Sequence, residues 1–424
     1  MTDPQSLLQA AAVRERCGTV MRWVEDGHSA HFTWHPQPLA DVAAYVIDTT
    51  RTRYPDLAAV PFHSRWRHFE AGGVDRWAAL TLESMKGRSR RGSPPREATA
   101  ASPSSGGTAH VSHPIERART AIDLVIPSVL LDAGAGPQWC YLDAPTGQTH
   151  VRSEGLGIAS LRWFERGAWS GDGHLRTDAA GLQALRPAQL EQAFQVSAAH
   201  PLVGSAGRIT LLQRLGAALA AQPEVFGPEV RLGRLFDHLQ RQSDHGRLPA
   251  ATLLHTLLSV FGRVWPGRAE LQGVPLGDCW HHPALPDRWV PFHKLTQWLA
   301  YSLLEPLAAG GVQVTGLDAL TGLPEYRNGG LLLDFGLLRP RDAAFPTTAW
   351  QVHDEPIVEW RAVTVTALDR IAAEVRRQIG LDAAQLPLAR VLEGGTWAAG
   401  RRIAATRRPG GAPPLTLHSD GTVF

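Results

Sequence analysis

The sequence lacks a long apolar run, and this lack limits the classes of protein to which it can belong. A membrane-spanning helix needs about 18 uninterrupted apolar residues. The nearest stretch, residues 121–131, is interrupted by Asp123 and Pro127. Residues 1–9 contain no basic segment followed by a long apolar one, which argues against a secretory signal. We therefore expect a soluble, cytoplasmic protein that has no membrane as a partner.

Cysteine is also scarce, and neither sign of charge predominates. The three cysteines, Cys17, Cys140 and Cys279, lack CxxC spacing. They predict neither a disulfide framework nor a zinc ribbon, and they fit a reducing compartment. The 42 basic and 40 acidic residues leave a net charge of +2, which gives no electrostatic reason to expect nucleic acid as a partner.

The usual signatures of nucleophile and nucleotide sites are missing. No GxSxG motif is present, and no cysteine has a convincing histidine partner nearby, so nucleophilic acyl transfer is poorly supported. Pro137 follows the glycine-rich segment 132–136 and breaks both the dinucleotide-binding and the Walker patterns. We interpret this segment as a tight connection between a helix and a hairpin. Asp132 is a pocket candidate because it ends an apolar helix.

Three histidines, His28, His31 and His35, have a spacing that raises the possibility of a metal site. Pro36 and Pro38 follow them and favour a loop rather than a helix that would align their rings. No carboxylate motif completes a ligand set. We therefore expect no metal and no cofactor.

Helical periodicity dominates what is present. Apolar residues recur at helical spacing over 4–24, 39–53, 74–85, 114–131, 202–221, 249–261, 292–307 and 356–379. A hairpin is expected over 139–151, and the end of the chain, 415–424, has the pattern of a strand, an Asp-Gly turn and a strand. The absence of βαβ alternation predicts a mainly α fold with a few short β-hairpins, built as one large domain over 1–424.

Residues 86–110 differ sharply from their surroundings. They are rich in Ser, Pro, Gly and Arg and contain almost no large apolar side chain. Such a stretch cannot bury enough surface to offset the entropy of ordering it. We interpret it as a flexible, low-complexity insertion, and as a surface loop rather than a linker.

The segment 61–70 is dense in cations and aromatic rings. It contains His63, Arg65, Trp66, Arg67, His68 and Phe69, followed by two glycines. One interpretation is a packed surface turn held by stacking of arginine on aromatic rings. The other is a pocket wall that binds a phosphate or a polar sugar.

Two further segments carry candidate chemistry. In the helix expected from residue 292, Lys294, Gln297 and Tyr301 fall on one polar stripe, which is either an ordinary solvated face or part of a site. Further along, Glu325 begins a run that ends in Gly329 and Gly330, at a junction between elements of the kind that often holds catalytic groups. The run continues with Tyr326, Arg327 and Asn328. The structural alternative is an ion pair of Glu325 with Arg327 that braces a turn.

Six blocks of the sequence together carry a resemblance. They are residues 62–76, 128–136, 291–294, 321–330, 393–401 and 419–424. These blocks resemble a fungal and bacterial uracil-catabolism family long catalogued as a domain of unknown function. The insertion at 86–110 departs from the family pattern, which is shorter there. The resemblance implies a pathway that converts uracil to its ribonucleotide and opens the ring. Ribosylurea or its 5′-phosphate is then split to urea and a ribose species.

A second, weaker resemblance bears on the bond that is cleaved. Phe292, Lys294 and Gln297, followed by Glu325-Tyr-Arg327, are similar to the Phe-x-Lys-x-x-Gln helix and Asp-Tyr-Arg segment of the queuosine-salvage nucleosidases. That family cleaves N-ribosides and has a helical fold related to DNA glycosylases. The resemblance places Glu325 where that family has its catalytic Asp, and Lys294 where it has its active-site Lys. The change from Asp to Glu, and the loss of the Val-Pro-Gln that follows, are departures.

Together these observations lead to the hypothesis of an N-glycosidase that hydrolyses ribosylurea or its 5′-phosphate. Glu325 would stabilise the cationic sugar or activate water, and Lys294, His63 or His68 would protonate the leaving urea. Arg65, Arg67 and Arg327 are the candidates for binding the phosphate of this small-molecule substrate. Two alternatives remain, namely an amide or ureido hydrolase of the opened ring and a non-catalytic sensor of the pathway.

Overall fold

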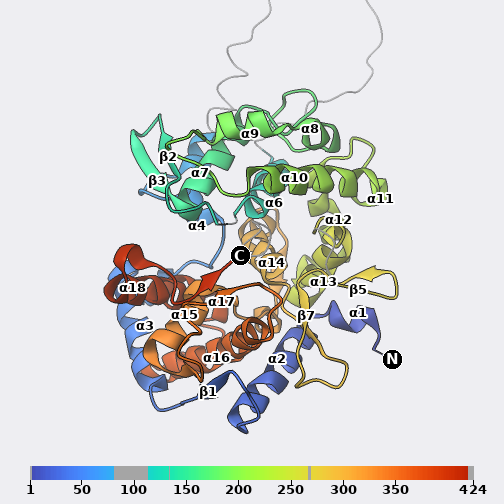
Figure 1. Ribbon diagram of the computed structural model, residues 1–424. Helices are drawn as coiled ribbons and strands as arrows, with labels where there is room; N and C mark the ends of the chain where they lie inside the picture. Colours follow the sequence, from blue (N-terminus) through green and yellow to red (C-terminus); the bar gives the residue numbers. More distant parts are fainter. Residues whose placement is uncertain (1, 81–112, 133, 266–268, 419–424) are drawn as a thin grey trace, which may run out of the picture.

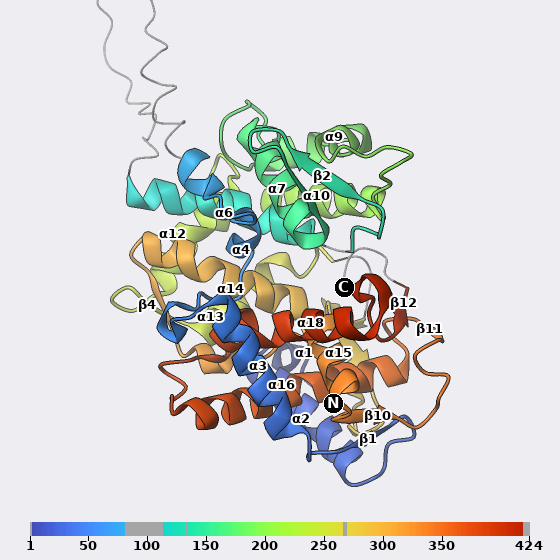
Figure 2. The same cartoon turned by 90° about the vertical axis from the view of Figure 1, so that its left-hand side faces the viewer.

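The computed structural model describes residues 2–80, 113–132, 134–265 and 269–418, which form two groups of helices around a central one. The central helix is α14 (Lys294–Ala309), which packs on α6 and α13. The upper group in Figures 1 and 2 contains α4 (Trp66–Phe69), α6 (Pro114–Leu130), α7 (Arg152–Glu165), α8 (Ala179–Ala184), α9 (Pro187–Ala193) and α10 (Ser205–Ala220).

The lower group covers the opposite side of α14 (Figure 2). It contains α2 (Ala10–Glu25), α3 (Leu39–Arg53), α15 (Tyr326–Phe335), α16 (Glu355–Ile379), α17 (Leu388–Val391) and α18 (Trp397–Arg407). α16 packs on α2 and α3, and α15 packs on α18. The remaining helices are α1 (Pro4–Leu7), α11 (Pro223–Phe226), α12 (Leu235–Gln242) and α13 (Ala250–Phe261).

The described strands form only two-stranded sheets. Three are local hairpins, made by β2 (Cys140–Asp143) with β3 (Gln148–Val151), β5 (Glu270–Leu271) with β6 (Val274–Pro275), and β7 (Cys279–His281) with β8 (Trp289–Pro291). Three join distant segments, namely β1 (Phe32–Trp34) with β10 (Leu338–Pro340), β4 (Arg247–Pro249) with β9 (Gln313–Thr315), and β11 (Ala349–Trp350) with β12 (Thr416–Leu417). The mainly α class expected from the sequence is therefore confirmed, while the relation to DNA glycosylases stays a prediction.

Most of the expected helices are present, and the differences have local causes. The helix expected over 4–24 is divided into α1 and α2, because Gln9 between them has an extended backbone (φ −106°, ψ 143°). Several helices were not predicted, of which the longest are α7, α18, α15 and α12. Within the described residues, the helix expected over 74–85 is helical at 76–80.

Two expectations concern residues outside the described part of the chain. The insertion at 86–110 lies wholly outside it, and so does the Asp-Gly turn expected near the C terminus. The expected strand before that turn is β12, which pairs in parallel with β11. No helix in the described ranges is both long enough and apolar enough to cross a membrane.

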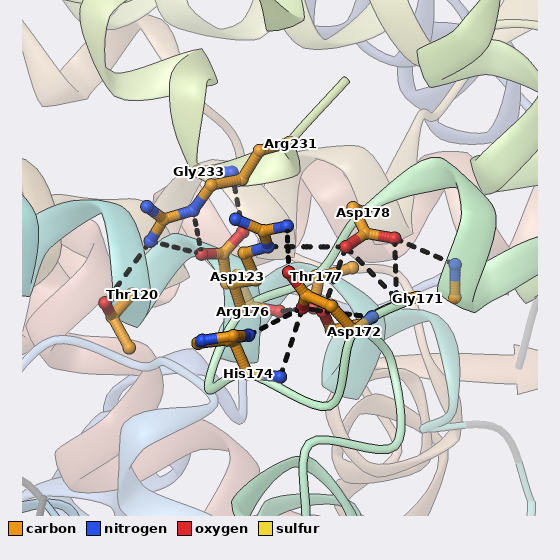
Figure 3. Close-up of polar contacts among 12 residues, drawn as sticks. Thr120, Asp123, Gly171, Asp172, His174, Arg176, Thr177, Asp178, Arg231 and Gly233 are labelled. Carbon is orange, nitrogen blue, oxygen red and sulfur yellow. Dashed lines mark hydrogen bonds and ion pairs between the residues drawn. The ribbon is translucent and has the colours of Figure 1, made fainter. Parts of the chain in front are cut away.

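α6 leads from the upper group to the centre of the molecule, and a buried carboxylate holds it in place (Figure 3). Asp123 accepts hydrogen bonds from Arg231 Nε at 2.8 Å and from the Gly233 amide at 2.7 Å. Thr177 Oγ1 donates to the Asp123 carbonyl at 2.7 Å. Burial raises the pKa of Asp123 to about 6, and the nearby Arg231 limits the rise. This network fixes α6, whose C-terminal end reaches Asp132.

Candidate functional site

A cavity of about 440 Å³ is lined by residues from both groups of helices and from α14. Its walls come from segments far apart in the sequence. The upper group contributes His68 and Arg152, α14 contributes Lys294, and the lower group contributes Glu325 and Trp397. The complete lining is His63, His68, Asp132, Gly134, Ala135, Gly136, Pro137, Arg152, Ser153, Lys294, Trp298, Leu323, Glu325, Tyr326, Arg327, Trp397, Pro413 and Leu417.

Glu325 is the residue at which α15 begins. Its Oε2 accepts the Arg327 amide and its Oε1 accepts the Asn328 amide, each at 2.7 Å. These bonds satisfy amides that have no partner within the helix, and they hold the carboxylate in one orientation. Burial raises the pKa of Glu325, whereas Lys294 and the two amides counteract the rise. The side chain is 7% exposed and lines the cavity, so it is both a helix cap and a cavity carboxylate.

Lys294 is the first residue of α14 and lines the same cavity. Its amide donates to Asp278 Oδ2 at 3.0 Å. Within the described chain, its ammonium group makes no hydrogen bond and no ion pair within 4 Å. Burial lowers the pKa of Lys294, and the charges of Glu325 and Asp132 act in the opposite direction. A buried ammonium without a direct partner is costly, which is typical of a group that meets a ligand.

The polar stripe predicted on α14 does not face solvent. Gln297 Nε2 donates to Thr321 Oγ1 at 2.7 Å, and Gln297 Oε1 accepts the Thr321 amide at 2.8 Å. Tyr301 Oη donates to the Thr321 carbonyl at 3.0 Å. Gln297 and Tyr301 therefore lie behind the cavity wall, where they hold the segment that leads to Glu325.

The segment 61–70 divides between the cavity and the protein interior. His63 and His68 line the cavity. Trp66 and Phe69 are buried beside each other, with their ring centroids 5.4 Å apart. Arg67 lies outside the lining and donates to both oxygens of Glu305, at 3.0 and 2.8 Å.

Arg65 is fully buried behind the cavity wall. Its Nη1 lies 2.9 Å from Asp132 Oδ1, its Nε donates to Ser128 Oγ at 2.8 Å, and its Nη1 donates to the Ser153 carbonyl at 3.0 Å. Arg65 therefore orients Asp132, which lines the cavity as expected. The positive charge of Arg65 is therefore paired with the carboxylate of Asp132.

His63 forms a dyad with Glu393, which the sequence did not single out. His63 Nδ1 lies 2.8 Å from Glu393 Oε2. Glu393 belongs to a π-helical turn, Leu392–Thr396, a feature that is frequent at functional sites. Burial tends to raise the pKa of Glu393, but the hydrogen bond and charge of His63, with the charge of Arg53, hold it below its usual value. Because Nδ1 is engaged by the carboxylate, Nε2 is the His63 nitrogen available to a ligand.

His68 has a different environment, although it lines the same cavity. Its Nδ1 lies 3.0 Å from Arg65 Nη1, so it accepts from that guanidinium. Burial, and then the charge of Arg65, lowers the pKa of His68 to about 4. The rings of Trp298 and Trp397 lie 5.8 and 6.4 Å from the His68 ring. His68 is therefore a neutral group between two aromatic rings near neutral pH.

The glycine-rich connection after α6 forms one wall of the cavity. Arg208 Nε donates to the Leu131 carbonyl at 3.0 Å, and Arg208 Nη2 donates to the Gly134 carbonyl at 3.1 Å. Gly136 has a φ of +88°, and a Cβ atom there would lie 2.8 Å from the Val203 side chain. The interpretation of this segment as a tight connection between a helix and a hairpin agrees with the structure.

The other predicted residues differ in their distance from the cavity. Tyr326 and Arg327 line it, and the Arg327 guanidinium lies 4.7 Å from the centroid of the Tyr326 ring. Asn328 is fully buried, and its Nδ2 donates to the Leu323 carbonyl at 3.0 Å. Arg152 and Trp397 line the cavity without having been predicted. Trp397 and Glu393 belong to a block that carried the family resemblance, which is the signal that could have found them.

The chain is thus a mainly helical protein with a cavity lined by a capped carboxylate, a lysine and the histidine of a histidine–glutamate dyad. Residues 6–424 match the protein family of unknown function DUF1688, and the chain belongs to that family. It is 37% identical to "Uracil catabolism protein 4" of Lachancea kluyveri, with 98% of this chain and 97% of the relative covered. It is 36% identical to "Protein urg3" of Schizosaccharomyces pombe, with 99% and 98% covered. The family resemblance predicted from the sequence blocks is therefore confirmed.

Proposed function

We propose that this protein acts in uracil catabolism as an N-glycosidase that hydrolyses ribosylurea, or its 5′-phosphate, to urea and a ribose species. The pathway follows from the printed name of the Lachancea relative and the extent of the match. The residues of the cavity support the reaction. The observation that carries it is the presence of Glu325 and Lys294 in one cavity, with electrostatic coupling between the two charges.

Glu325 is assigned to the anomeric carbon of the sugar. When the bond from that carbon to the urea nitrogen breaks, positive charge develops on the sugar, and a nearby carboxylate stabilises it. A carboxylate has about four lone-pair positions, and the two amides use two of them. The remaining positions can orient a water molecule and accept its proton. A pKa raised by burial makes Glu325 a better base for this step.

His63 is assigned to the leaving group. Urea departs poorly as an anion, so its nitrogen or oxygen must receive a proton as the electron pair of the broken bond moves onto it. His63 Nδ1 donates to Glu393 Oε2, which orients the ring and leaves Nε2 as the nitrogen that gives the proton to the leaving group. His68 is the weaker candidate, because its pKa is lowered to about 4 and it is neutral when a donor is needed.

Lys294 completes the set through its charge. Its ammonium favours the ionised form of Glu325, which is the form the reaction needs. Trp298 and Trp397 provide apolar surfaces beside the two histidines. Such surfaces exclude water from the leaving group and strengthen the electrostatic interactions inside the cavity.

The position of oxygen transfer tests this proposal directly. Wild-type protein is incubated with synthetic ribosylurea and its 5′-phosphate in ¹⁸O-labelled water, and the products are analysed at early times by mass spectrometry. We expect urea without label and a ribose species that carries the label on its anomeric carbon. Label in carbon dioxide together with released ammonia would instead establish a ureido hydrolase. Binding of either compound without formation of any product would support a non-catalytic sensor of the pathway instead.

A further inference from the structure

Arg152 lines the cavity in an unfavourable backbone conformation. It is the first residue of α7 and has a φ of +55°, in the left-handed region that side chains other than those of Gly and Asn rarely adopt. Such a conformation costs about 1–3 kcal/mol and is found most often at functional sites. The position therefore has a reason other than backbone geometry to carry a long cationic side chain.

A second arginine, Arg327, binds the same turn of the backbone as Arg152. Arg152 Nη2 donates to the Gly410 carbonyl at 3.0 Å, and Arg327 Nη1 donates to the adjacent Gly411 carbonyl at 3.1 Å. Within the described residues, no carboxylate lies within 4 Å of either guanidinium. Burial lowers the pKa of Arg152, and the like charge of Arg327 lowers it further. The described part of the chain thus holds two cations near each other, and none of its carboxylates forms an ion pair with either of them.

Two carboxylates around these two arginines are paired with other cations. Glu154, the nearest carboxylate in sequence, lies 2.6 Å from Arg401 and is occupied by it. Asp132 is held by Arg65. Lys294, which is 8% exposed and has no direct partner among the described residues, lines the same cavity. The lining of the cavity therefore includes three cations, Arg152, Arg327 and Lys294, besides the carboxylate of Glu325.

The start of α7 adds a further source of positive potential. Val151 occupies the cap position and offers no side-chain acceptor, so the first amides of this 14-residue helix are not capped by it. Arg152 and Ser153, in the first turn, line the cavity. Glu154 in this turn accepts its own amide, and the other first amides, together with the helix dipole, favour a bound anion.

We propose that Arg152 and Arg327, with the first turn of α7, form a subsite for a phosphate monoester dianion, and that the substrate is the 5′-phosphate rather than the free riboside. This inference rests on the proposed function for the identity of the sugar. Two guanidiniums match a dianion in charge and in hydrogen-bonding geometry. Arg65 and Arg67, which the sequence offered for this role, each lie beside a carboxylate instead.

The experiment measures binding of ribose 5-phosphate and of ribose by calorimetry to wild-type protein and to Arg152→Gln, Arg152→Lys and Arg166→Gln. Arg166 is the control, because it is exposed at the far end of α7 and its replacement removes the same charge. We expect wild type to bind ribose 5-phosphate much more tightly than ribose. Arg152→Gln should weaken binding of the phosphate roughly 10- to 100-fold, as for a lost hydrogen bond to a charged group.

The remaining variants make the result decisive. Arg152→Lys should recover part of the loss, and Arg166→Gln should bind like wild type. Thermal unfolding of each variant verifies that it is folded, and Arg327→Gln provides a second test of the same subsite. Equal binding of ribose and ribose 5-phosphate by wild type, or an Arg152→Gln variant that is folded and binds like wild type, would overturn the inference. Binding of ribose 5-phosphate without release of urea would remove the proposed reaction and leave the subsite intact.

Discussion

Arg361 binds Asp278 with two parallel hydrogen bonds, from Nη1 to Oδ1 and from Nη2 to Oδ2, each 2.8 Å long. This pair bonds to the backbone of Lys294 and of the residue before Glu325. Asp278 Oδ2 accepts the Lys294 amide at 3.0 Å, and Arg361 Nε donates to the Pro324 carbonyl, next to Glu325, at 3.4 Å. Burial would raise the pKa of Asp278, but Arg361 holds it well below its usual value. The ion pair therefore fixes the start of α14 relative to the start of α15.

Replacing Arg361 by Lys should separate Lys294 from Glu325. The lysine keeps the charge but cannot form the two parallel bonds and the third to Pro324. We expect a loss of about 1.5–3 kcal/mol in stability for each hydrogen bond to a charged group that is lost, measured by urea denaturation. We also expect a lower kcat in protein that is still folded.

The matched control is Arg76→Lys, which weakens the buried pair of Arg76 with Asp143, neither of which lines the cavity. It should reduce stability to a comparable extent and leave the kcat of the folded protein unchanged. Equal kcat values for the two variants would show that the Arg361–Asp278 pair has no specific role in the site.

Replacing Lys294 by Met should shift the pH dependence of the reaction. The charge of Lys294 lowers the pKa of Glu325, so its removal raises that pKa further. Because the reaction needs ionised Glu325, the acidic limb of kcat/KM should move to higher pH. Lys294→Arg keeps the charge and should leave the limb close to its wild-type position. An unshifted limb in Lys294→Met would contradict the coupling of the two residues.

Replacing His63 by Gln should slow the reaction to an extent that depends on whether the leaving group needs a proton. Loss of a general acid typically costs roughly 10²- to 10⁴-fold, and this cost falls on leaving groups that need protonation. Urea release should therefore collapse, while hydrolysis of 4-nitrophenyl riboside, whose leaving group is stable as an anion, should change little. Steady-state rates on both substrates give the comparison. His68→Gln is the control, and it should affect the two substrates to a similar extent.

His68 should make the stability of the protein depend on pH. Burial and the charge of Arg65 lower its pKa from 6.5 to about 4 in the folded state. The unfolded chain therefore takes up a proton on His68 at a higher pH than the folded protein does. The free energy of unfolding is consequently highest above the unfolded pKa, and it decreases as the pH falls toward 4. Between pH 7 and pH 5 the loss should be about 2 kcal/mol.

Urea denaturation of wild type and His68→Gln at a series of pH values measures this contribution. The difference in unfolding free energy between the two proteins should shrink as the pH falls. The exposed His245, with a side chain that is 94% exposed, provides the control, and His245→Gln should follow wild type throughout. A difference that stays constant with pH would show that folding does not lower the pKa of His68.

The sequence predicted those parts of the site that depend on local pattern. Helical periodicity placed Lys294, Gln297 and Tyr301 on one face of a helix, and two of these side chains do contact the segment that leads to Glu325. The Glu-Tyr-Arg pattern indicated a junction between elements, and Glu325 is the residue that caps α15. Such features follow from spacing along one element, and spacing is visible in a single sequence.

The parts that the sequence missed depend on tertiary contacts. The sequence offered Arg65 and Arg67 as ligands of a phosphate, because nothing local reveals that Asp132 and Glu305 lie beside them. Arg152 gave no signal, since a left-handed φ at an arginine is not encoded by any short pattern. Asp278 and Arg361 are 83 positions apart, and only the folded chain brings them together.

The most direct test of the account compares Glu325→Gln with Asp178→Asn on synthetic ribosylurea 5′-phosphate. Both residues cap a helix with their carboxylates, α15 and α8 respectively, and Asp178 does not line the cavity. The account predicts that both variants fold, that Asp178→Asn releases urea at the wild-type rate, and that Glu325→Gln releases it roughly 10²- to 10⁴-fold more slowly. Urea release by folded Glu325→Gln at the wild-type rate would contradict it.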